Sequence, residues 1–450
     1  MEFNYKIYQN MKNFIKSLAV CLLGILFLGL TSCGNSGTQN QAIDPFSNGG
    51  KERNMIVVIS DIHLGADLAY AECNKNLEPL EELLKQLKKS PNVKELVIAG
   101  DLLDEWFVPA TVDTYQGKDQ ADFVQRIATA NKGVIDALNS IINEKKILVT
   151  YVPGNHDLTV TAESVALILP GINQKRDPEL GLGTYSPADY PTIAIEHGHR
   201  YNFFCAPDPI SNQDIAPGTI MPPGYFFTRL AALHVSQKRP IAADVVPVVT
   251  RNASGNQSQD LLFAYWKLWE WSINLFTIEN KFDENIFVTN VNGLTGTYSV
   301  NDLLPFQKTA GGLIDVNLYK GIQDTWDQRQ LHNRVDVNIP VQQAIANASS
   351  ATETDDMAKI QYFLNPDSDK RIVIFGHSHV PVIVTSEDNN GQKSIYANSG
   401  TWIDHNPNKT TANFIVITPQ SKDASSNTFV KLYNFENKVV TLMAEDSLRY

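Results

Sequence analysis

Residues 55–63 read MIVVISDIH, an apolar β-branched run that ends in Asp61 and His63. Such a run indicates a buried strand, and the polar residues after it then lie on a loop at the edge of a sheet. Similar apolar runs precede four further segments, and six of the nine histidines of the chain fall within the five segments. The four are GDLLD at 100–104, GNHD at 154–157, HGH at 197–199 and GHSH at 376–379.

The residue types in these segments favour divalent metal ions. Imidazole and carboxylate together suit Mn, Fe or Zn, whereas an all-carboxylate set would suit Mg or Ca better. None of the five segments contains Cys, which excludes a structural zinc site of the thiolate type. The sequence therefore predicts two divalent metal ions at the ends of strands, and hydrolytic chemistry.

The ordered set DxH, GDxxD, GNHD, HGH and GHxH, running from Asp61 to His379, resembles the calcineurin-like metallophosphoesterase superfamily. The resemblance implies a two-metal phosphoesterase in which Asp101 bridges the ions and a metal-bridging hydroxide attacks phosphorus. Asp61, His63 and His379 would hold the first ion. Asn155, His197 and His377 would hold the second.

The resemblance gives His156 a different role, facing the phosphate rather than a metal ion. Asp104 would orient His156 and favour its protonated form, so that the imidazole stabilises the transition state or protonates the leaving oxygen. The structural alternative is that Asp104 only caps the following turn. Asp157 is predicted to be a hydrogen-bonding turn residue, and His199 remains an alternative to His197 as ligand.

The order of the elements predicts an α/β fold. Strands at 55–60, 95–99, 147–152 and 192–196 alternate with helical patterns at roughly 77–89 and 120–143. From Arg371 the apolar runs follow one another without helices, so these strands are expected to pair mainly antiparallel. Two mixed sheets flanked by helices fit the four-layer αββα sandwich that the resemblance implies, and the turn Asn398-Ser399-Gly400 is interpreted as structural.

Residues 203–368 separate the fourth motif from the fifth and contain no metal motif. They include two helical stretches, GYFFTRLAALHVSQKR and LLFAYWKLWEWSINLF, and the second is apolar nearly all round. We interpret this segment as a helical cap-like insertion beside the metal site, with a simple extension of the core as the alternative. Arg229 could grip a second phosphate or be an ordinary solvated arginine, and His234 is expected to lie on a helix face.

The N-terminus carries export signals. Three lysines precede the apolar run 18–30, which is too short for a comfortable membrane span and ends in Leu30-Thr31-Ser32-Cys33, typical of a bacterial lipoprotein signal. The predicted organisation is a signal peptide at 1–32, a flexible tether at 33–53 and a metallophosphoesterase domain at 54–450. Lipidated Cys33 would hold the protein in the cell envelope, on the periplasmic face of the outer membrane.

The net charge of the chain argues against two classes of partner. Without residues 1–32 the chain has 34 basic and 48 acidic residues and a net charge of −14, which argues against nucleic acid and broad adhesion to anionic lipid. Cys73 and Cys205 would remain, either as thiols or as a disulfide, and we favour two thiols.

Two classes of function remain. The first is hydrolysis of a phosphate mono- or diester or a pyrophosphate in a phosphorylated small-molecule or lipid-like substrate. The GDLLDEW run, the HGH motif and the anchor are similar to the UDP-diacylglucosamine pyrophosphatase branch, although a scavenging phosphatase, nucleotide hydrolase or phosphodiesterase fits export as well. The second class is a non-catalytic metal- or ligand-binding lipoprotein that retains the fold.

Overall fold

Two mixed β-sheets form the centre of the protein in a computed structural model that describes residues 44–450 except 178, 242–243, 349, 351, 408 and 422–425. The larger sheet has seven strands in the order β15-β14-β13-β1-β2-β3-β4, and the smaller has four in the order β11-β12-β10-β5. In the larger sheet, β1, β2, β3 and β4 are parallel, while β13, β14 and β15 run antiparallel to their neighbours. Its strands are β1 (Met55–Ile59), β2 (Val93–Ala99), β3 (Leu148–Val152), β4 (Asn173–Gln174), β13 (Asn413–Thr418), β14 (Thr428–Glu436) and β15 (Val439–Leu448).

The strands after Arg371 pair mainly antiparallel, as expected, and β10 in the smaller sheet is the exception. In that sheet the central strand β10 runs parallel to both β5 and β12, and only β11 pairs antiparallel. The carboxyl ends of β5 and β10 therefore lie at the same edge, as the carboxyl ends of β1, β2 and β3 do in the larger sheet. Its strands are β5 (Ile193–Ile195), β10 (Ile372–Phe375), β11 (Val382–Glu387) and β12 (Lys393–Asn398).

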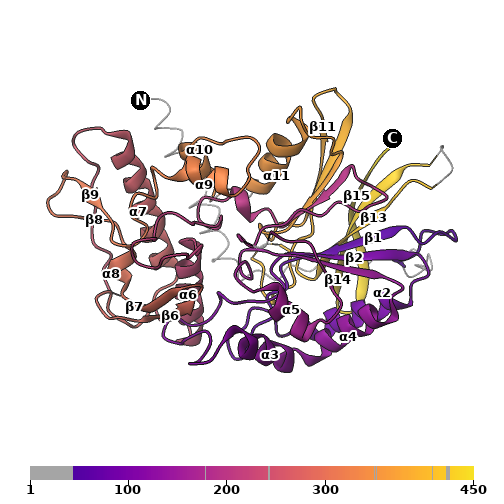
Figure 1. The fold of residues 1–450 in the computed structure, drawn as a ribbon, viewed down its shortest axis with the longest axis horizontal. Coiled ribbons are helices and arrows are strands. Elements are labelled where there is room, and N and C mark those ends of the chain that lie inside the picture. Colours follow the sequence, from indigo (N-terminus) through magenta and orange to yellow (C-terminus); the bar gives the residue numbers. More distant parts are fainter. Residues whose placement is uncertain are drawn as a thin grey trace, which may run out of the picture.

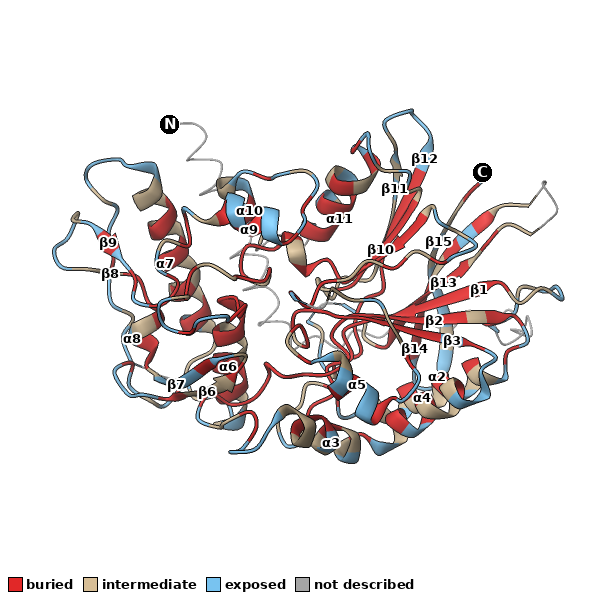
Figure 2. Ribbon diagram, viewed as in Figure 1, coloured by how far each residue is buried: buried red, intermediate tan, exposed pale blue. Residues whose placement is uncertain are grey.

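Three buried clusters show that the layers are helix, sheet, sheet and helix. Along β1, Ile56 and Val58 face the second sheet and pack with side chains such as Ile374, whereas Val57 and Ile59 pack on the helices of the first sheet. The outer face of the smaller sheet is covered by α11 (Glu353–Ala358) and the π-helical turn η2 (Lys359–Phe363), and their side chains surround residues such as Phe375. Period-2 alternation of an entirely apolar strand thus fills two cores at once. The central strands β1 and β10 are buried along their length, whereas the edge strands β11 and β15 are mostly half-buried or exposed (Figure 2). The predicted αββα sandwich is confirmed.

Helices α2 (Leu77–Lys89) and α4 (Lys132–Glu144) cover the outer face of the larger sheet, with α3 (Gln120–Ala130) and α5 (Ala162–Ile168) beside them (Figure 1). The helix predicted at 77–89 is confirmed. The single helix predicted at 120–143 is wrong, because the chain breaks at Asn131, whose amide nitrogen donates to the carbonyl oxygens of Gly65 and Ile127 at 2.8 Å.

The insertion is a mixture of helix, hairpin and long irregular segments rather than a helical unit. The two predicted helices are present as α6 and α7, but two small two-stranded sheets and several short helices accompany them. Figure 1 shows most of this region to the left of the two sheets, beyond the strand ends that carry the motifs. Its elements are α6 (Gly224–Ser236), α7 (Gln257–Leu275), β6 (Phe287–Val291), β7 (Leu294–Tyr298), α8 (Val300–Leu303), β8 (Phe306–Gln307), β9 (Ile314–Asp315), α9 (Trp326–His332), α10 (Val341–Asn347), α11 (Glu353–Ala358) and η2 (Lys359–Phe363).

The aromatic residues of the insertion form its own core. Trp269 is fully buried and stacks on Phe227 with ring centroids 3.9 Å apart, and Tyr265 stacks on Phe204. Arg229 is also fully buried, and its guanidinium donates to main-chain carbonyl oxygens of 108–112 and to Val288. Both interpretations of Arg229 are therefore wrong, because it ties the insertion to the loop after β2.

The features predicted at the N-terminus, including the signal peptide and Cys33, lie mostly outside the described residues. The last part of the predicted tether is described from residue 44, and it packs on the domain: Phe46 is buried, and its carbonyl oxygen accepts from Ser90 Oγ at 2.6 Å. Cys73 and Cys205 are free thiols. No helix in the described part of the chain is long and apolar enough to cross a membrane.

Candidate metal centre

The five motif loops meet where the carboxyl edges of the two sheets come together. The loops after β1, β2 and β3 come from the larger sheet, and those after β5 and β10 come from the smaller one. Because parallel strands present their carboxyl ends at one edge, residues more than 300 positions apart become neighbours. Most of these side chains are buried, and His156, His377 and His379 are partly exposed.

Asp61, His63 and His379 form the first group. His379 Nε2 lies 3.1 Å from Asp61 Oδ1 and 3.3 Å from His63 Nε2. Ligand atoms of all three residues lie within 4.8 Å of one another, so they could hold one metal ion. These are the three residues predicted for the first ion.

Asn155, His197 and His377 form the second group. Asn155 Oδ1 lies 3.0 Å from His197 Nε2 and 2.9 Å from His377 Nδ1. The other nitrogen of His197, Nδ1, lies 2.9 Å from the carbonyl oxygen of Ala99 and must donate to it. In the neutral imidazole this fixes the tautomer that leaves a lone pair on Nε2, so electron-pair donors converge there, as a cation requires.

Asp101 lies between the two groups. Its Oδ2 is 3.1 Å from His197 Nε2 and 3.7 Å from His63 Nε2, and its Oδ1 accepts from the backbone N–H of His156 at 2.8 Å. Asp61, Asp101 and His197 also have ligand atoms close enough to hold one ion. Asp101 is thus the carboxylate placed to reach both groups, and the donor set fits the divalent ions predicted from the sequence.

The backbone at the site is unusual. Five of the seven predicted ligands have positive φ angles between 50° and 71°, a region that residues with a Cβ rarely adopt. Such conformations cluster at functional sites and cost of order 1–3 kcal/mol each, which the surrounding structure must offset. The five are Asp61, His63, Asp101, His377 and His379.

Close backbone approach explains two glycines of the motifs. A Cβ on Gly154 would lie 2.1 Å from Asp101 Oδ1, and a Cβ on Gly376 would lie 2.5 Å from Asp61 Oδ2. Asp157 holds the same region together, since its carboxylate accepts from the N–H groups of Gly154 at 2.7 Å and Leu102 at 2.8 Å. The prediction that Asp157 is a hydrogen-bonding turn residue is confirmed.

Asp104 both caps a turn and pairs with His156. Its Oδ1 accepts from the N–H groups of Trp106 and Phe107 and lies 2.8 Å from His156 Nδ1. Burial lowers the pKa of His156, but the carboxylate of Asp104 more than offsets this, so the pKa lies above its usual value. Burial raises the pKa of Asp104, and His156 and His63 outweigh it, so Asp104 stays ionised.

Glu72 and Trp106 lie next to Asp104 and His156 and were not predicted as site residues. Glu72 Oε2 lies 3.5 Å from His63 Nδ1, on the side where Asp104 Oδ2 also approaches at 3.2 Å. Trp106 stacks on His156 with ring centroids 5.0 Å apart. Trp106 could have been found from the sequence, because it directly follows the GDLLDE run. Glu72 lies in a loop without any motif, so no sequence pattern points to it.

His199 is buried beside His197, with ring centroids 5.3 Å apart, and neither ring nitrogen has a hydrogen-bond partner within the described chain. Burial, together with His197 and His377, holds the pKa of His199 well below its usual range. His199 is in none of the groups whose ligand atoms converge among the described residues. The geometry therefore favours His197, as expected. His234 packs on a helix face, with Nδ1 2.5 Å from the carbonyl oxygen of Thr277.

The insertion touches two of the motif loops. The ring of Tyr225 meets that of Trp106 at 6.2 Å, edge to face, and Thr354 Oγ1 lies 3.2 Å from Ser378 Oγ within the GHSH loop. Parts of the insertion thus contact the motif loops, whereas α11 and η2 cover the outer face of the smaller sheet.

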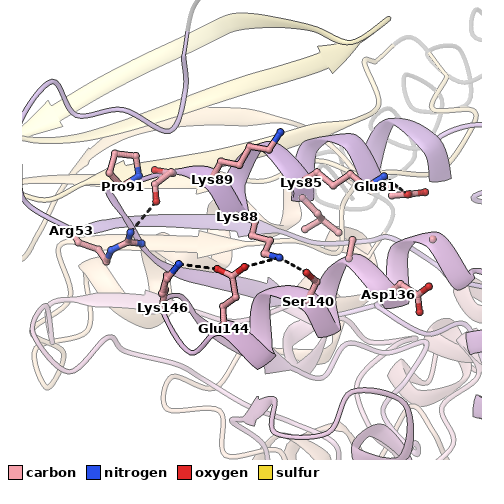
Figure 3. A pocket seen from close by; sticks show the side chains of 14 residues that line it. Arg53, Glu81, Lys85, Lys88, Lys89, Pro91, Asp136, Ser140, Glu144 and Lys146 are labelled. Carbon is pink, nitrogen blue, oxygen red and sulfur yellow. Dashed lines mark hydrogen bonds and ion pairs between the residues drawn. The ribbon is translucent and has the colours of Figure 1, made fainter.

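A pocket of about 900 Å³ lies away from these loops, between α2 and α4. Figure 3 shows ion pairs along its walls: Lys88 contacts Ser140 and Glu144, and Glu144 also pairs with Lys146. None of the motif residues lines this pocket, so its size does not make it the candidate site.

Comparison with known families agrees with the geometry. Residues 55–225 match the family described as calcineurin-like phosphoesterase. The chain therefore carries a domain of the metallophosphoesterase superfamily, with the fold expected for it. The match spans the first four motifs, and the fifth, GHSH, lies beyond it but is brought to the same centre by β10. Among curated proteins, nothing matches the chain.

Proposed function

We propose that the protein is a dinuclear metal-dependent phosphoesterase that hydrolyses phosphate ester or pyrophosphate bonds. The family match and the groups of His and Asp that could hold metal support a phosphoesterase. The observation that carries the two-ion proposal is the position of Asp101 Oδ2, within 3.1 Å of one group of donors and 3.7 Å of the other.

The chain would hold the first ion with Asp61, His63 and His379, and the second with Asn155, His197 and His377, Asp101 serving both. Two divalent ions bound there supply a water of lowered pKa and neutralise charge on the phosphoryl oxygens. The carbonyl oxygen of Ala99 orients His197 before metal binds. The left-handed backbone at five of the ligands sets the direction of their side chains.

His156 is the residue that donates the proton in this proposal. Its ring is fixed between the stacked indole of Trp106 and the carboxylate of Asp104, so the imidazole is held by two contacts on different sides. With Nδ1 directed at Asp104, Nε2 is the nitrogen that donates a proton to the leaving oxygen or a hydrogen bond to the phosphoryl group. Asp104 stays ionised and stabilises the protonated imidazole.

Bound-metal analysis of the purified protein, combined with hydrolysis of 4-nitrophenyl phosphate in added Mn, tests this function. We expect two equivalents of metal per chain and turnover that chelation abolishes. An inert protein that binds two metal ions would instead support the non-catalytic alternative. The substrate class is then mapped by phosphate release from nucleotides, sugar phosphates and phospholipid head groups.

We also propose that the chain is exported and lipid-anchored through Cys33, a residue outside the described part of the structure. The support is the sequence alone: a basic start, a short apolar run and the Leu-Thr-Ser-Cys ending. The Cys33→Ala variant should move from the membrane fraction to the soluble fraction. An unchanged distribution would contradict the anchor.

A further inference from the structure

A small cationic pocket of about 300 Å³ is lined by residues that follow β4 and the HGH motif, and by one residue of the insertion. Three parts of the chain supply its basic residues: the segment after β4 supplies Lys175 and Arg176, the HGH loop supplies Arg200, and the insertion supplies Arg334. Such a concentration of positive charge is notable in a chain whose net charge is −12.

The topology puts this pocket next to the second group of ligands. β4 is the edge strand beside β3, and β5 is the edge strand of the smaller sheet, so both sheets end here. Lys175 N–H donates to the carbonyl oxygen of Tyr151, four residues before Asn155, and Arg200 follows His197 by three residues. Asp61 and His63 of the first group follow β1, further toward the middle of the larger sheet, while His377 and His379 both follow β10.

Two of the four cations have carboxylate partners. Arg200 Nε lies 2.9 Å from Glu196 Oε2, and Arg334 Nη1 lies 2.6 Å from Asp177 Oδ2. Lys175 and Arg176 form no ion pair with any described residue. The pocket therefore keeps an excess of positive charge after its internal pairs are counted.

Arg176 gives the strongest indication of an anion site. Its Nη1 is a buried donor without a hydrogen-bond partner among the described residues. A buried donor left unpaired destabilises the folded protein, so an acceptor is expected there. Guanidinium groups match the geometry of phosphate and carboxylate oxygens, which they bind with two parallel hydrogen bonds.

We propose that this pocket binds a second anionic group of the substrate, a phosphate next to the one that is hydrolysed, and so selects substrates with more than one phosphate. The inference rests on the proposed function and narrows its substrate class. Arg176 is the principal contact, Arg200 and Lys175 add charge, and Arg334 makes recognition depend on the insertion.

Competition kinetics test the proposal on the full-length, metal-loaded protein. Inorganic phosphate and inorganic tripolyphosphate compete with 4-nitrophenyl phosphate. The ratio of their inhibition constants measures how much the additional phosphates strengthen binding. We expect Arg176→Gln to reduce the advantage of tripolyphosphate at least tenfold, as loss of charge-assisted hydrogen bonds implies. Arg334→Gln should reduce it less, because that side chain is 68% exposed.

Lys89→Gln, in the distant groove between α2 and α4 (Figure 3), is the matched control and should leave the ratio unchanged. An unchanged ratio in Arg176→Gln would overturn the proposal, since tripolyphosphate would then bind through the metal centre alone. Thermal melts of every variant check that the fold is intact.

Direct calorimetric binding of tripolyphosphate separates this proposal from the proposed function. If the wild-type protein hydrolyses no phosphate ester but binds tripolyphosphate, and Arg176→Gln weakens that binding tenfold, the function has failed while the anion site stands. If the wild-type protein hydrolyses phosphate esters but binds tripolyphosphate no more tightly than Arg176→Gln does, the phosphoesterase proposal is supported and the anion-site proposal is wrong.

Discussion

Replacing Asp104 by Asn should separate the charge of this side chain from its structural role. The amide keeps an oxygen that accepts from the N–H groups of Trp106 and Phe107 at the turn, and the side-chain volume is unchanged. What disappears is the negative charge 2.8 Å from His156 Nδ1. The turn should therefore survive while the protonated form of His156 loses its stabilising partner.

The magnitude follows from that one contact. A hydrogen bond to a charged group contributes about 1.5–3 kcal/mol, and each 1.36 kcal/mol of activation free energy is a factor of ten in rate. We therefore expect kcat to fall about 10–100-fold for an alkyl phosphate, whose leaving oxygen needs a proton. For 4-nitrophenyl phosphate, whose leaving group departs as a stable anion, the fall should be below about tenfold. Parallel kinetics on the two substrates with excess Mn measure this difference.

A double-mutant cycle with His156→Ala tests whether Asp104 acts through His156. If it does, adding Asp104→Asn to His156→Ala should lower kcat by no more than about a further factor of three, because coupled residues are not additive. Glu72→Gln is the matched control: Glu72 approaches the same His63 nitrogen as Asp104 and forms no hydrogen bond with His156. Additive losses, or equal losses for both substrates, would refute this reasoning. A shared loss of bound metal in Glu72→Gln and Asp104→Asn would assign the effect to His63.

Three further outcomes are expected. Asp101→Ala should lower bound metal below the level of His379→Ala in elemental analysis, because both ions lose a ligand; two retained metals with near-normal turnover would contradict the bridging role. Burial raises the pKa of Glu353 to about 8, against 4.5 unfolded, so the folded protein keeps a proton that the unfolded chain releases, and stability falls as pH rises from about 5 to 8. Glu353→Gln should flatten that fall in thermal melts, and identical pH profiles would rule the linkage out. Gly154→Ala should cost most of the activity through its clash with Asp101, measured beside Gly50→Ala, where the nearest atom would be 3.4 Å away.

The strands and motif residues could be predicted because both signals are local. Apolar β-branched runs mark buried strands, and short polar motifs at their ends mark loops at one edge. Local signals also explain the main error in the first half of the chain. The apolar spacing continues through Asn131, and Asn costs a helix interior at most about 0.7 kcal/mol relative to Ala. The break comes from a tertiary hydrogen bond to Gly65, which no local pattern contains.

The remaining departures also come from contacts between distant parts of the chain. Neighbouring strands in sequence usually pair with each other, yet β10 pairs with β5 across the whole insertion. Glu72 approaches His63 from a loop with no periodicity, so only the fold shows it. Arg229 looked like an exposed helix residue, but five carbonyl oxygens from two other segments surround it in the folded protein.

The placement of aromatic and charged residues bears on the substrate. The GDLLDEW run, the HGH motif and the predicted anchor were the reasons to consider a lipid-like substrate, but Trp266, Trp269 and Trp326 of the insertion are each at most 3% exposed and pack within the protein. A side chain used in the core cannot also bind an acyl chain. What the insertion places beside the motif loops is instead Arg334, in a pocket with Lys175 and Arg176. These cations are the basis of our proposal that the substrate carries more than one phosphate group, because phosphate would bind them through charge-assisted hydrogen bonds.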